Sequence, residues 1–430
     1  MRGQKGKNMK KITALLLTVI LALGLLAGCT GEGGSGKKTD GKVSGKVTIV
    51  TANDTTGAVT HMLEAFKKAY PDVEVEHQML PGASDDVKKS LMTSFAAGDT
   101  DPDVIACDII WVSQFAAADW LLDVTSELEA VQNQYLGGPL KTCYYNGKAY
   151  AFPDYTDVGL LYYRTDIIDT PPATWDELVK MCNDHKGEGG TEYGFVFQMF
   201  QGEPTSCNML EFIKQNGGQD LKDGKFSMAN SNTYEALDFV KSLIADGITP
   251  EDVLGWRPDD SLSVFSEGKA IFMRNWTYAY ARTQLEESKV AGKVGVTALT
   301  IGPNGKESSG TLGGWNLAIN KNTDNKEAAI ALAKFMTSAE AQKIATIERS
   351  TFPTQKAMYE DKDVLEALPY LSSMKTAADT AAPRPQVRDY PTVSTIFQEY
   401  FHKVLAGGEE NEATMKAMDD ALNEALEKMK

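Results

Sequence analysis

Cysteine is scarce in this chain, which contains five in 430 residues, and no two of them are spaced as CxxC. So few cysteines exclude a disulfide-rich scaffold, and the missing CxxC spacing removes the usual sign of a zinc or redox site. Cys107, Cys143, Cys182 and Cys207 lie in the part of the sequence that we expect to fold. One disulfide among them stays open as an alternative, but free buried thiols are favoured.

The motifs of common catalytic sites are also missing. The sequence contains no GxSxG and no HExxH, and its four histidines are scattered. A GxGxxG pattern at 31–36 and a near phosphate-loop pattern at 36–43 lie in a Gly-rich stretch and not between a strand and a helix, so we treat both as chance. In so acidic a chain, Asp154 and Asp157 alone do not indicate glycoside hydrolysis. We therefore predict no catalytic residue, no cofactor and no metal.

Basic residues are outnumbered by acidic ones. The chain has 43 Lys and Arg against 59 Asp and Glu, for a net charge of −16. Residues 1–28 carry five basic and no acidic residues, so their removal leaves 38 against 59, a net charge of −21. Such a charge excludes nucleic acid as an expected partner, because binding of the phosphate backbone depends on Lys and Arg.

No apolar run reaches the roughly 20 residues that a membrane-spanning helix needs. The longest, Ile12–Leu26, follows a Lys-rich start and ends in Ala27-Gly28-Cys29, which is the pattern of a signal peptide over 1–28. A cysteine after Ala-Gly resembles the bacterial lipobox, and this resemblance implies lipidation of Cys29, with a palmitate-type acyl chain. Ordinary cleavage near Ala27 remains the alternative, and Met9 is an alternative start to Met1.

The rest of the chain divides into a flexible start and a folded part. Residues 29–45 are rich in Gly, Ser, Lys and Thr and predict a tether. Beyond them, strand-like and helix-like segments alternate, which predicts an α/β protein with mainly parallel sheets and, at this length, two lobes. Strands are expected at 47–52, 73–77, 104–107, 193–197, 270–273, 294–299 and 317–319, and helices at 59–70, 84–97, 174–185 and 234–245, with mostly helix after 325.

Aromatic residues stand beside planar polar groups where several of these strands end. Examples are Asp108 with Trp111, the segments 152–157 and 274–278, and Gly313-Gly314-Trp315. In α/β sheets ligands bind beyond the carboxyl ends of strands, so these segments are expected to converge on one site. A sugar suits such a site, because its C–H faces pack on aromatic rings and its hydroxyls match Asp and Arg. Each aromatic taken alone is equally well explained as a core residue.

The chain resembles the extracellular solute-binding proteins of ABC sugar importers, of the trehalose/maltose-binding type. The motifs that carry the resemblance are DPDVIACDIIW (101–111), GKAYAFPDYTDVGLLYYRTDII (147–168), PPATWDELV (171–179), FSEGKAIFMRNWTYAY (265–280), KVGVTALTIGPNG (293–305), TLGGWNLAIN (311–320) and APRPQVRDYPTVSTIFQEYFHKVLAG (382–407). The resemblance implies sugar contacts by Asp108, Tyr155, Asp157, Trp276, Tyr278, Gly313, Gly314, Trp315 and Arg384. In this picture the acidic residues and Arg384 bond hydroxyls, the rings stack, and the glycines let the backbone approach the sugar.

The sequence departs from the family pattern at two places. Thr277 stands where the family commonly has proline, and threonine, like proline, suits the start of a helix. The segment 84–89 and the loop with Asn53 and Asp54 do not repeat the polar pattern of disaccharide binders, which leaves the identity of the ligand open and makes Asn53 and Asp54 only candidate contacts.

The resemblance also implies an architecture and a mechanism. It implies a type II periplasmic-binding-protein-like fold with the ligand in an interlobe cleft, an N-lobe of 46–153 and 303–350, and a C-lobe of 154–302 and 351–430. The chain is expected to cross between the lobes near Asp154, Gly302 and Ser350. The lobes are expected to close on a disaccharide or short oligosaccharide. The protein is expected to be a monomer, anchored to the membrane on its extracellular face. In the closed state it would dock on permease subunits that work with an ATPase.

Two other functions are weighed against this one. A binding protein for a non-sugar solute, such as a polyamine or a metal chelate, could share the architecture, although Arg384 argues against a polyamine. An exported carbohydrate-active enzyme could share the aromatic and acidic residues, but it needs two carboxylates about 5–9 Å apart, one of them with a raised pKa.

Overall fold

The computed structural model describes residues 42–80, 84–372, 374, 377, 381–385 and 387–429. The predicted signal peptide, Cys29 and most of the predicted tether lie outside these residues. Among the described residues, no helix combines the length and the apolar character that crossing a membrane requires.

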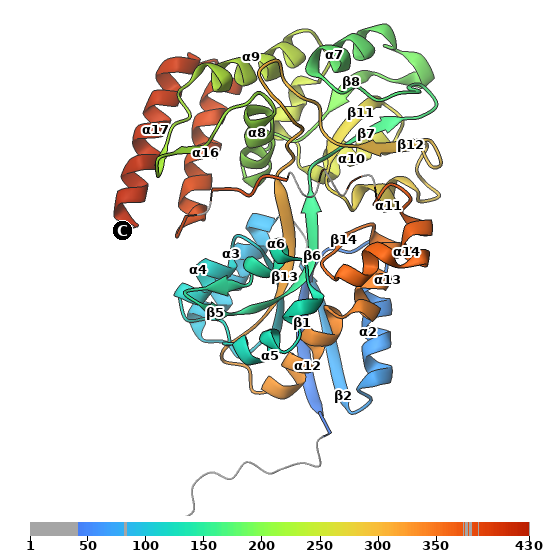
Figure 1. Cartoon of the computed structure of the whole chain (residues 1–430), viewed down its shortest axis with the longest axis vertical. Coiled ribbons are helices and arrows are strands. Elements are labelled where there is room, and N and C mark those ends of the chain that lie inside the picture. Colours follow the sequence, from blue (N-terminus) through green and yellow to red (C-terminus); the bar gives the residue numbers. More distant parts are fainter. Residues whose placement is uncertain are drawn as a thin grey trace, which may run out of the picture. The chain divides into compact units, whose positions relative to one another are not determined.

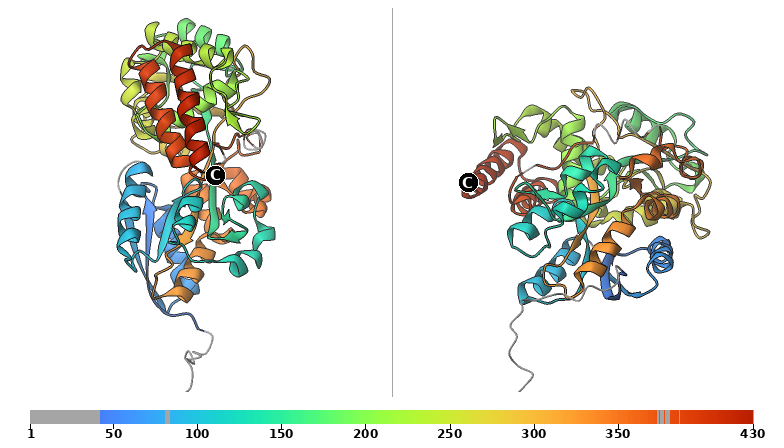
Figure 2. Two further views of the ribbon diagram at one scale, coloured as in Figure 1. Left: turned by 90° about the vertical axis from the view of Figure 1, so that its left-hand side faces the viewer. Right: turned by 60° about the horizontal axis from the view of Figure 1, so that its bottom comes forward.

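The first lobe is built on a six-stranded mixed sheet with helices on both faces (Figures 1 and 2). The strand order is β14-β6-β13-β3-β1-β2. Its strands are β1 (Gly45–Ala52), β2 (Val73–Leu80), β3 (Val104–Asp108), β6 (Ala151–Val158), β13 (Leu312–Ile319) and β14 (Phe352–Pro353), and β4 (Tyr144–Tyr145) and β5 (Lys148–Ala149) form a small hairpin beside it. Its helices are α2 (Ala58–Ala69), α3 (Ser84–Ala97), α4 (Val112–Ala117), α5 (Thr125–Glu129), α6 (Gly137–Lys141), α12 (Lys326–Met336) and α13 (Ala339–Arg349).

The second lobe is built on a four-stranded sheet in the order β12-β7-β11-β8. Its strands are β7 (Leu160–Arg164), β8 (Tyr193–Val196), β11 (Ala270–Asn275) and β12 (Val294–Thr297), and β9 (Leu221–Lys222) pairs with β10 (Lys225–Phe226). Its helices are α7 (Trp175–Asp184), α8 (Glu203–Gln215), α9 (Ser231–Ala245), α10 (Pro258–Ser266), α11 (Ala279–Thr283), α16 (Tyr390–Leu405) and α17 (Asn411–Lys428), and α14 (Lys362–Ala367) packs on α13. Helices α16 and α17 lie side by side (Figure 2).

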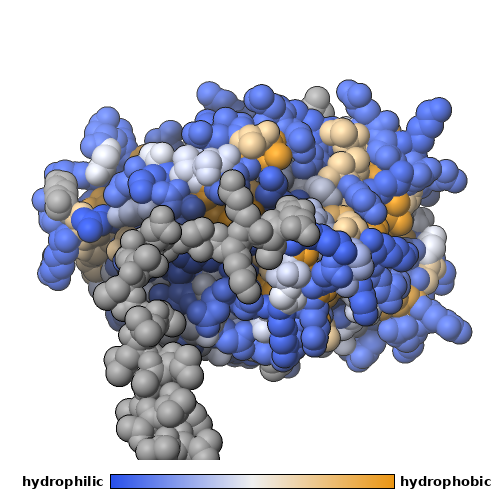
Figure 3. Space-filling view, turned by 90° about the horizontal axis from the view of Figure 1, so that it is seen from below, coloured by the Kyte–Doolittle hydropathy of each residue, from blue (hydrophilic) through white to orange (hydrophobic). Residues whose placement is uncertain are grey.

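Alternation of side chains along the strands explains the two cores of the second lobe. Leu161 and Phe272 join one apolar cluster, whereas their neighbours Tyr162 and Met273 join another. Successive strand residues point to opposite faces, so each face of the sheet has its own cluster. The face of the molecule in Figure 3 is mostly hydrophilic, with smaller apolar areas, as expected where large apolar side chains are gathered inside.

Most predicted elements are present, but the sheets are less parallel than predicted. β1 pairs in parallel with β2 and β3, and β11 with β8, whereas β13, β6 and β14 pair antiparallel, as do β7 and its two neighbours. The reason is that β13 enters the first sheet directly from the second lobe and β7 enters the second sheet directly from the first lobe, so each runs against most strands of its sheet. The helix predicted from Thr174 is present as α7 and begins with a capping box between Thr174 and Glu177. The four cysteines of the folded part are free and buried.

The chain passes between the sheets at Gly159, between β12 and β13, and again after β14. The last passage differs from the expected position near Ser350. Ser350 ends α13 with a left-handed conformation, φ 58°, and the next residues return to the first sheet as the edge strand β14, paired with β6. The first sheet therefore extends past the boundary at 350.

The crossing segments are bonded to one another. The amide of Gly159 donates to the carbonyl of Thr311 at 3.4 Å. The amide of Ala382 donates to the carbonyl of Gly310 at 2.8 Å. The amide of Leu312 returns a bond to Ala382 at 2.8 Å. We call these three segments (Gly159, 310–312 and 381–382) the crossing ribbon. A Cβ on Gly159 would lie 2.1 Å from Oε1 of Glu211, so only glycine fits there.

Candidate ligand-binding site

Three adjacent strands of the first sheet bring most of the predicted ligand residues together. Trp315 on β13 is paired with Asp108 on β3 and with Tyr155 on β6. One step along β13, Gly314 and Gly313 are opposite Thr156 and Asp157. Trp111, one turn beyond β3, is buried and packs edge-on against Trp315, with ring centroids 5.2 Å apart. The predicted convergence of these strand ends is therefore present in the structure, and sugar contact by them stays a prediction.

Glycine is needed at both Gly313 and Gly314 on β13, because a Cβ at either position would come too close to other protein atoms. Gly314 has φ 131°, and a Cβ there would lie 2.6 Å from the carbonyl oxygen of Tyr155. A Cβ on Gly313 would lie 3.0 Å from Cζ3 of Trp276, which follows β11 of the second sheet. Gly313 thus lets an aromatic ring from the second lobe approach the first sheet.

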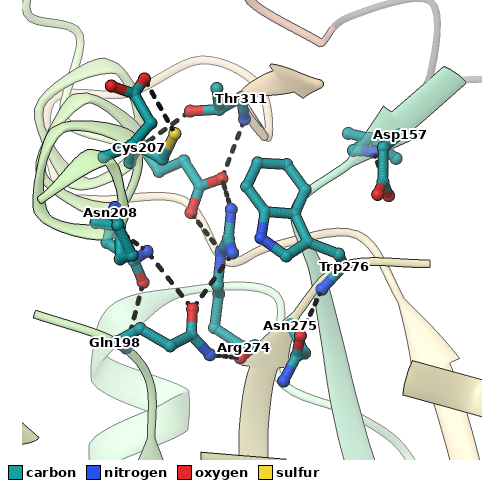
Figure 4. A network of polar contacts seen from close by, with 12 residues as sticks. Asp157, Gln198, Cys207, Asn208, Arg274, Asn275, Trp276 and Thr311 are labelled. Atoms are coloured by element: carbon teal, nitrogen blue, oxygen red, sulfur yellow. Dashed lines mark hydrogen bonds and ion pairs between the residues drawn. The ribbon is translucent and has the colours of Figure 1, made fainter. Parts of the chain in front are cut away.

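Trp276 lies beside a buried ion pair that includes Arg274 (Figure 4). The guanidinium of Arg274 lies 4.1 Å from the indole centroid, a cation–π contact, and Asp157 lies on the other side of the ring in this view. Arg274 makes a two-pronged ion pair with Glu211 of α8 and donates to Oε1 of Gln198 at 3.2 Å. The side chains of both Arg274 and Glu211 are 2% exposed.

The same carboxylate fixes the crossing ribbon. Oε1 of Glu211 accepts a hydrogen bond from the amide of Thr311 at 2.9 Å, and the hydroxyl of Thr311 donates to the carbonyl of Cys207 at 3.0 Å. A single buried pair therefore supports the ring that was predicted to stack on sugar and a segment that joins the lobes.

Asp157 is tied to the second lobe through Thr277. Its Oδ1 accepts from the amide of Val158 at 3.0 Å and from the amide and hydroxyl of Thr277 at 2.9 and 2.8 Å. Burial raises the pKa of Asp157 to about 6, and the bonds from Thr277 act in the opposite direction. The sequence-based view of Thr277 as a helix cap is wrong, because α11 begins at Ala279 and its N-cap position is Tyr278, with no side-chain cap. A proline here would supply neither of the two donors.

Arg384 links carboxylates from both lobes. Its guanidinium donates to Oδ1 of Asp108 at 3.2 Å and to Oε1 of Glu203, the first residue of α8, at 2.9 Å. Glu203 also accepts from the hydroxyl of Tyr390 at 2.7 Å. Arg384 was expected to bond sugar hydroxyls directly, but its charge is already balanced by two buried carboxylates, so any sugar contact shares the guanidinium with them.

The surroundings of Tyr278, Tyr155 and Asp54 complete the description of the predicted residues. The hydroxyl of Tyr278 is 3.4 Å from Oδ1 of Asp259, and Arg282 lies over its ring at 6.0 Å. Tyr155 is half-buried, and the guanidinium of Arg349 lies 5.0 Å from its ring centroid. Asp54 accepts the amides of Thr56 and Val59 at 2.9 Å each, so it caps the start of α2 instead of being available as a simple ligand contact.

Asp154 differs from the other acidic residues of the group. It is 9% exposed, and burial raises its pKa to about 7, although Arg349 acts to lower it. The unfolded chain loses this proton near pH 4, whereas the native state keeps it up to about pH 7. The stabilisation linked to the bound proton is thus complete below pH 4 and is lost as the pH rises through 7.

We expect Asp154→Asn to remove this pH dependence. At pH 8 the variant should be more stable than the wild type by about 1–3 kcal/mol, because a neutral amide costs less to bury than a carboxylate. At pH 5 the two proteins should differ little. Thermal unfolding of both proteins between pH 5 and 8 measures the difference, and Asp157, which titrates in the same window, contributes equally to both. Parallel curves at all pH values would contradict the assignment.

Sequence reasoning missed Glu211, Glu203 and Arg349, together with the roles of Arg274 and Thr277. Arg274 stands two residues before Trp276 within the aromatic segment 274–278, which is the only sequence signal for it. The described residues contain no cluster of His, Cys, Asp and Glu arranged to hold a metal ion.

Comparisons with known proteins agree with this arrangement. Residues 52–343 match the model of the bacterial extracellular solute-binding protein family. The Probable ABC transporter-binding protein of Deinococcus radiodurans is 35% identical over 321 residues, covering 71% of this chain and 76% of that protein. The arabinooligosaccharide-binding protein of Bacillus subtilis is 24% identical over 344 residues, covering 76% and 77%. Among solved structures, maltose-bound MalE3 of T. maritima matches with a TM-score of 0.84 and 37% identity, over 89% of this chain and all of that one.

Proposed function

We propose that this chain, which belongs to the bacterial extracellular solute-binding protein family, captures a neutral sugar between its two lobes for an ABC permease. The observation that carries the proposal is the position of Trp276. Its ring is supported by Arg274, lies against Gly313 of the other lobe and has Asp157 close by.

The chemistry of this group favours a sugar over a charged solute. An indole face gives an apolar platform for sugar C–H groups, and carboxylates and guanidinium groups beside it pair with hydroxyls. The acidic and basic groups are also paired with one another, as in Arg384 with Asp108 and Glu203. Because Asp108 and Glu203 already share one arginine, they offer less to a polyamine than to an uncharged polyol.

The size class that we propose is a disaccharide or a short oligosaccharide such as maltose or trehalose. Support comes from MalE3, whose solved structure is maltose-bound, and from the arabinooligosaccharide-binding relative. A ligand that contacts both lobes favours the closed state by its differential affinity for it. The closed monomer would then dock on the permease, which works with an ATPase. No bond of the sugar is made or broken, and no cofactor takes part.

Anchoring to the cell membrane is part of the proposal. The lipobox-like end of the signal peptide, Leu26 to Cys29, supports a lipid on Cys29 and a position on the extracellular face. Phase partition in a mild detergent should place the wild-type protein in the detergent phase and Cys29→Ser in the aqueous phase. Equal partition of the two would overturn the anchor and leave the sugar-binding proposal intact.

Titration calorimetry of residues 43–430 with maltose, trehalose and maltotriose tests the sugar-binding proposal. We expect at least one of them to bind with a dissociation constant in the micromolar range or below, which corresponds to about −8 kcal/mol. Spermidine and a ferric chelate serve as the non-sugar arm of the experiment. Binding by one of these and by none of the sugars would refute the sugar assignment. Analysis of the sugar after incubation checks for turnover, and any hydrolysis would favour an enzyme.

A further inference from the structure

We propose that Asp154 and Arg349 form a second polar subsite on the first-lobe wall of the ligand site, which takes a hydroxyl group of the sugar. This inference rests on the proposed function and extends it to Asp154 and Arg349, for which no sugar contact was predicted from the sequence. It is carried by the backbone of β6, by the burial of Asp154 and by the cavity that its carboxyl lines.

The backbone of β6 aims Asp154 away from the regular pattern of the strand. In the pairing with β13, Tyr155 is opposite Trp315 and Pro153 is opposite Asn316, so Asp154 is the extra residue of a β-bulge. The carbonyl of Asp154 accepts from the side-chain amide of Gln342 at 2.6 Å, which holds the bulge in place. Bulges re-aim side chains, and they are frequent beside binding sites.

The carboxyl of Asp154 has no hydrogen-bond donor among the described residues, and its oxygens are not among their fully buried unpartnered atoms, so they remain accessible. Its side chain makes no hydrogen bond and no ion pair within 4 Å in this part of the chain, although the residue is only 9% exposed. A buried carboxyl without a partner costs several kcal/mol relative to one in water. The carboxyl of Asp154 is thus a hydrogen-bond acceptor that no other side chain among the described residues uses.

The carboxyl lines a cavity whose wall includes the aromatic residues of the site. Its polar lining consists of Thr51, Asp154, Tyr155 and Arg349, and Trp315 forms another part of the wall. The cavity has room for about one water molecule, which is also the size of one hydroxyl group. Tyr155 and Trp315, which are predicted to contact the sugar, are half-buried and form part of the cavity wall. The cavity therefore adjoins the surface on which the sugar is expected to stack.

The two charged groups that line the cavity complement a hydroxyl. Arg349 and Asp154 are not in ion-pair contact in the described structure, so a gap separates donor from acceptor. A hydroxyl can donate to the carboxylate and accept from the guanidinium at once. An ammonium group would be repelled by Arg349 and a carboxylate or phosphate by Asp154, whereas a neutral polyol satisfies both residues. The other lining residues, among them Val59, Met62 and Leu317, are apolar and suit sugar carbons.

Few other titratable groups face this subsite. Asp54 is close enough to Arg349 for an electrostatic contribution, and Nε2 of His77 on β2 is 2.8 Å from the hydroxyl of Thr51. Asp157 and Tyr155 are the remaining titratable groups near it on β6. The elements β3, β13, α2 and α12 contribute only apolar or uncharged residues to the cavity wall.

Titration calorimetry of residues 43–430 tests the subsite. The ligand is whichever of maltose, trehalose and maltotriose the wild type binds best. Asp154→Ala should weaken binding by about 10- to 100-fold, as expected for loss of a hydrogen bond to a charged group. Asp154→Asn, which keeps the shape and one acceptor oxygen, should fall between Asp154→Ala and the wild type. Asp119→Asn removes a surface carboxylate of the same lobe and should bind as the wild type does.

The proton balance of binding gives a second readout. A hydroxyl that donates to Asp154 favours its ionised form, so the wild type should release part of a proton on binding at pH 7. The measured enthalpy would then depend on the ionisation enthalpy of the buffer, and this dependence should disappear in Asp154→Asn. Wild-type affinity and wild-type proton release in Asp154→Asn would overturn the subsite while the proposed function stands. Failure of the wild type to bind any of the three sugars would overturn both.

Discussion

Arg274→Met is expected to lower the free energy of unfolding by about 3–5 kcal/mol, the largest effect on stability of any single change considered for this protein. Methionine fills most of the space of arginine but leaves Glu211 as an uncompensated buried charge. Both side chains are 2% exposed, so solvent cannot replace the lost partner. Chemical unfolding followed by far-UV circular dichroism, with a constant m-value, measures the loss.

Two further variants separate the charge from the packing. Arg274→Met combined with Glu211→Gln removes both charges, and it should be more stable than Arg274→Met alone, because no unpaired charge remains. Lys416→Met breaks the exposed pair with Glu412 on α17 and should change stability little. Equal stability of Arg274→Met and the wild type would show that the pair contributes nothing, and the support for Trp276 would need another explanation.

Trp276→Ala is expected to weaken sugar binding by about 2–4 kcal/mol, or roughly 30- to 1,000-fold, since aromatic anchors dominate binding energies. The ring is fixed before the ligand arrives, because Arg274 lies 4.1 Å from its centroid and Gly313 leaves space for its edge. A ligand that stacks on it therefore pays little for ordering the side chain. Titration calorimetry measures the loss.

The matched variants for this prediction are Trp276→Phe and Trp256→Phe. Phenylalanine at 276 keeps a smaller ring and should retain part of the affinity, whereas Trp256 is half-buried in the second lobe and its replacement should leave binding unchanged. Unchanged affinity of Trp276→Ala would remove the main support for the site, even though the family assignment would remain.

Part of the site could be predicted because strand ends are visible in the sequence. Asp108, Trp315 and Tyr155 each stand where an apolar β-rich segment meets aromatic and polar residues. The observed register places these three side by side on β3, β13 and β6. The convergence of these strand ends could be predicted because the relevant information is local, whereas sugar contact by these residues stays a prediction.

Other parts depend on contacts between distant segments and left no local signal. Glu211 lies on α8, of whose residues only Pro204 and Lys214 are not buried, so its polar residues do not mark a solvent-exposed face as they do on a surface helix. Its pairing with Arg274 spans 63 residues. The bulge at Asp154 depends on the register with β13, and the bonds from Thr277 to Asp157 depend on how the two lobes meet. None of these follows from spacing or composition.

The crossing ribbon limits how the lobes can move. Its three segments are hydrogen-bonded to one another and to Glu211, so they bend together and cannot slide past each other. Motion of one lobe relative to the other is then close to a rotation about the ribbon, and atoms near that axis change their separation least. Trp276 lies over the pair that anchors the ribbon, so in the proposed lobe closure a sugar stacked on it would gain similar affinity in the open and the closed state. The preference for the closed state would then come from contacts farther from the axis, where a small rotation makes or breaks a bond.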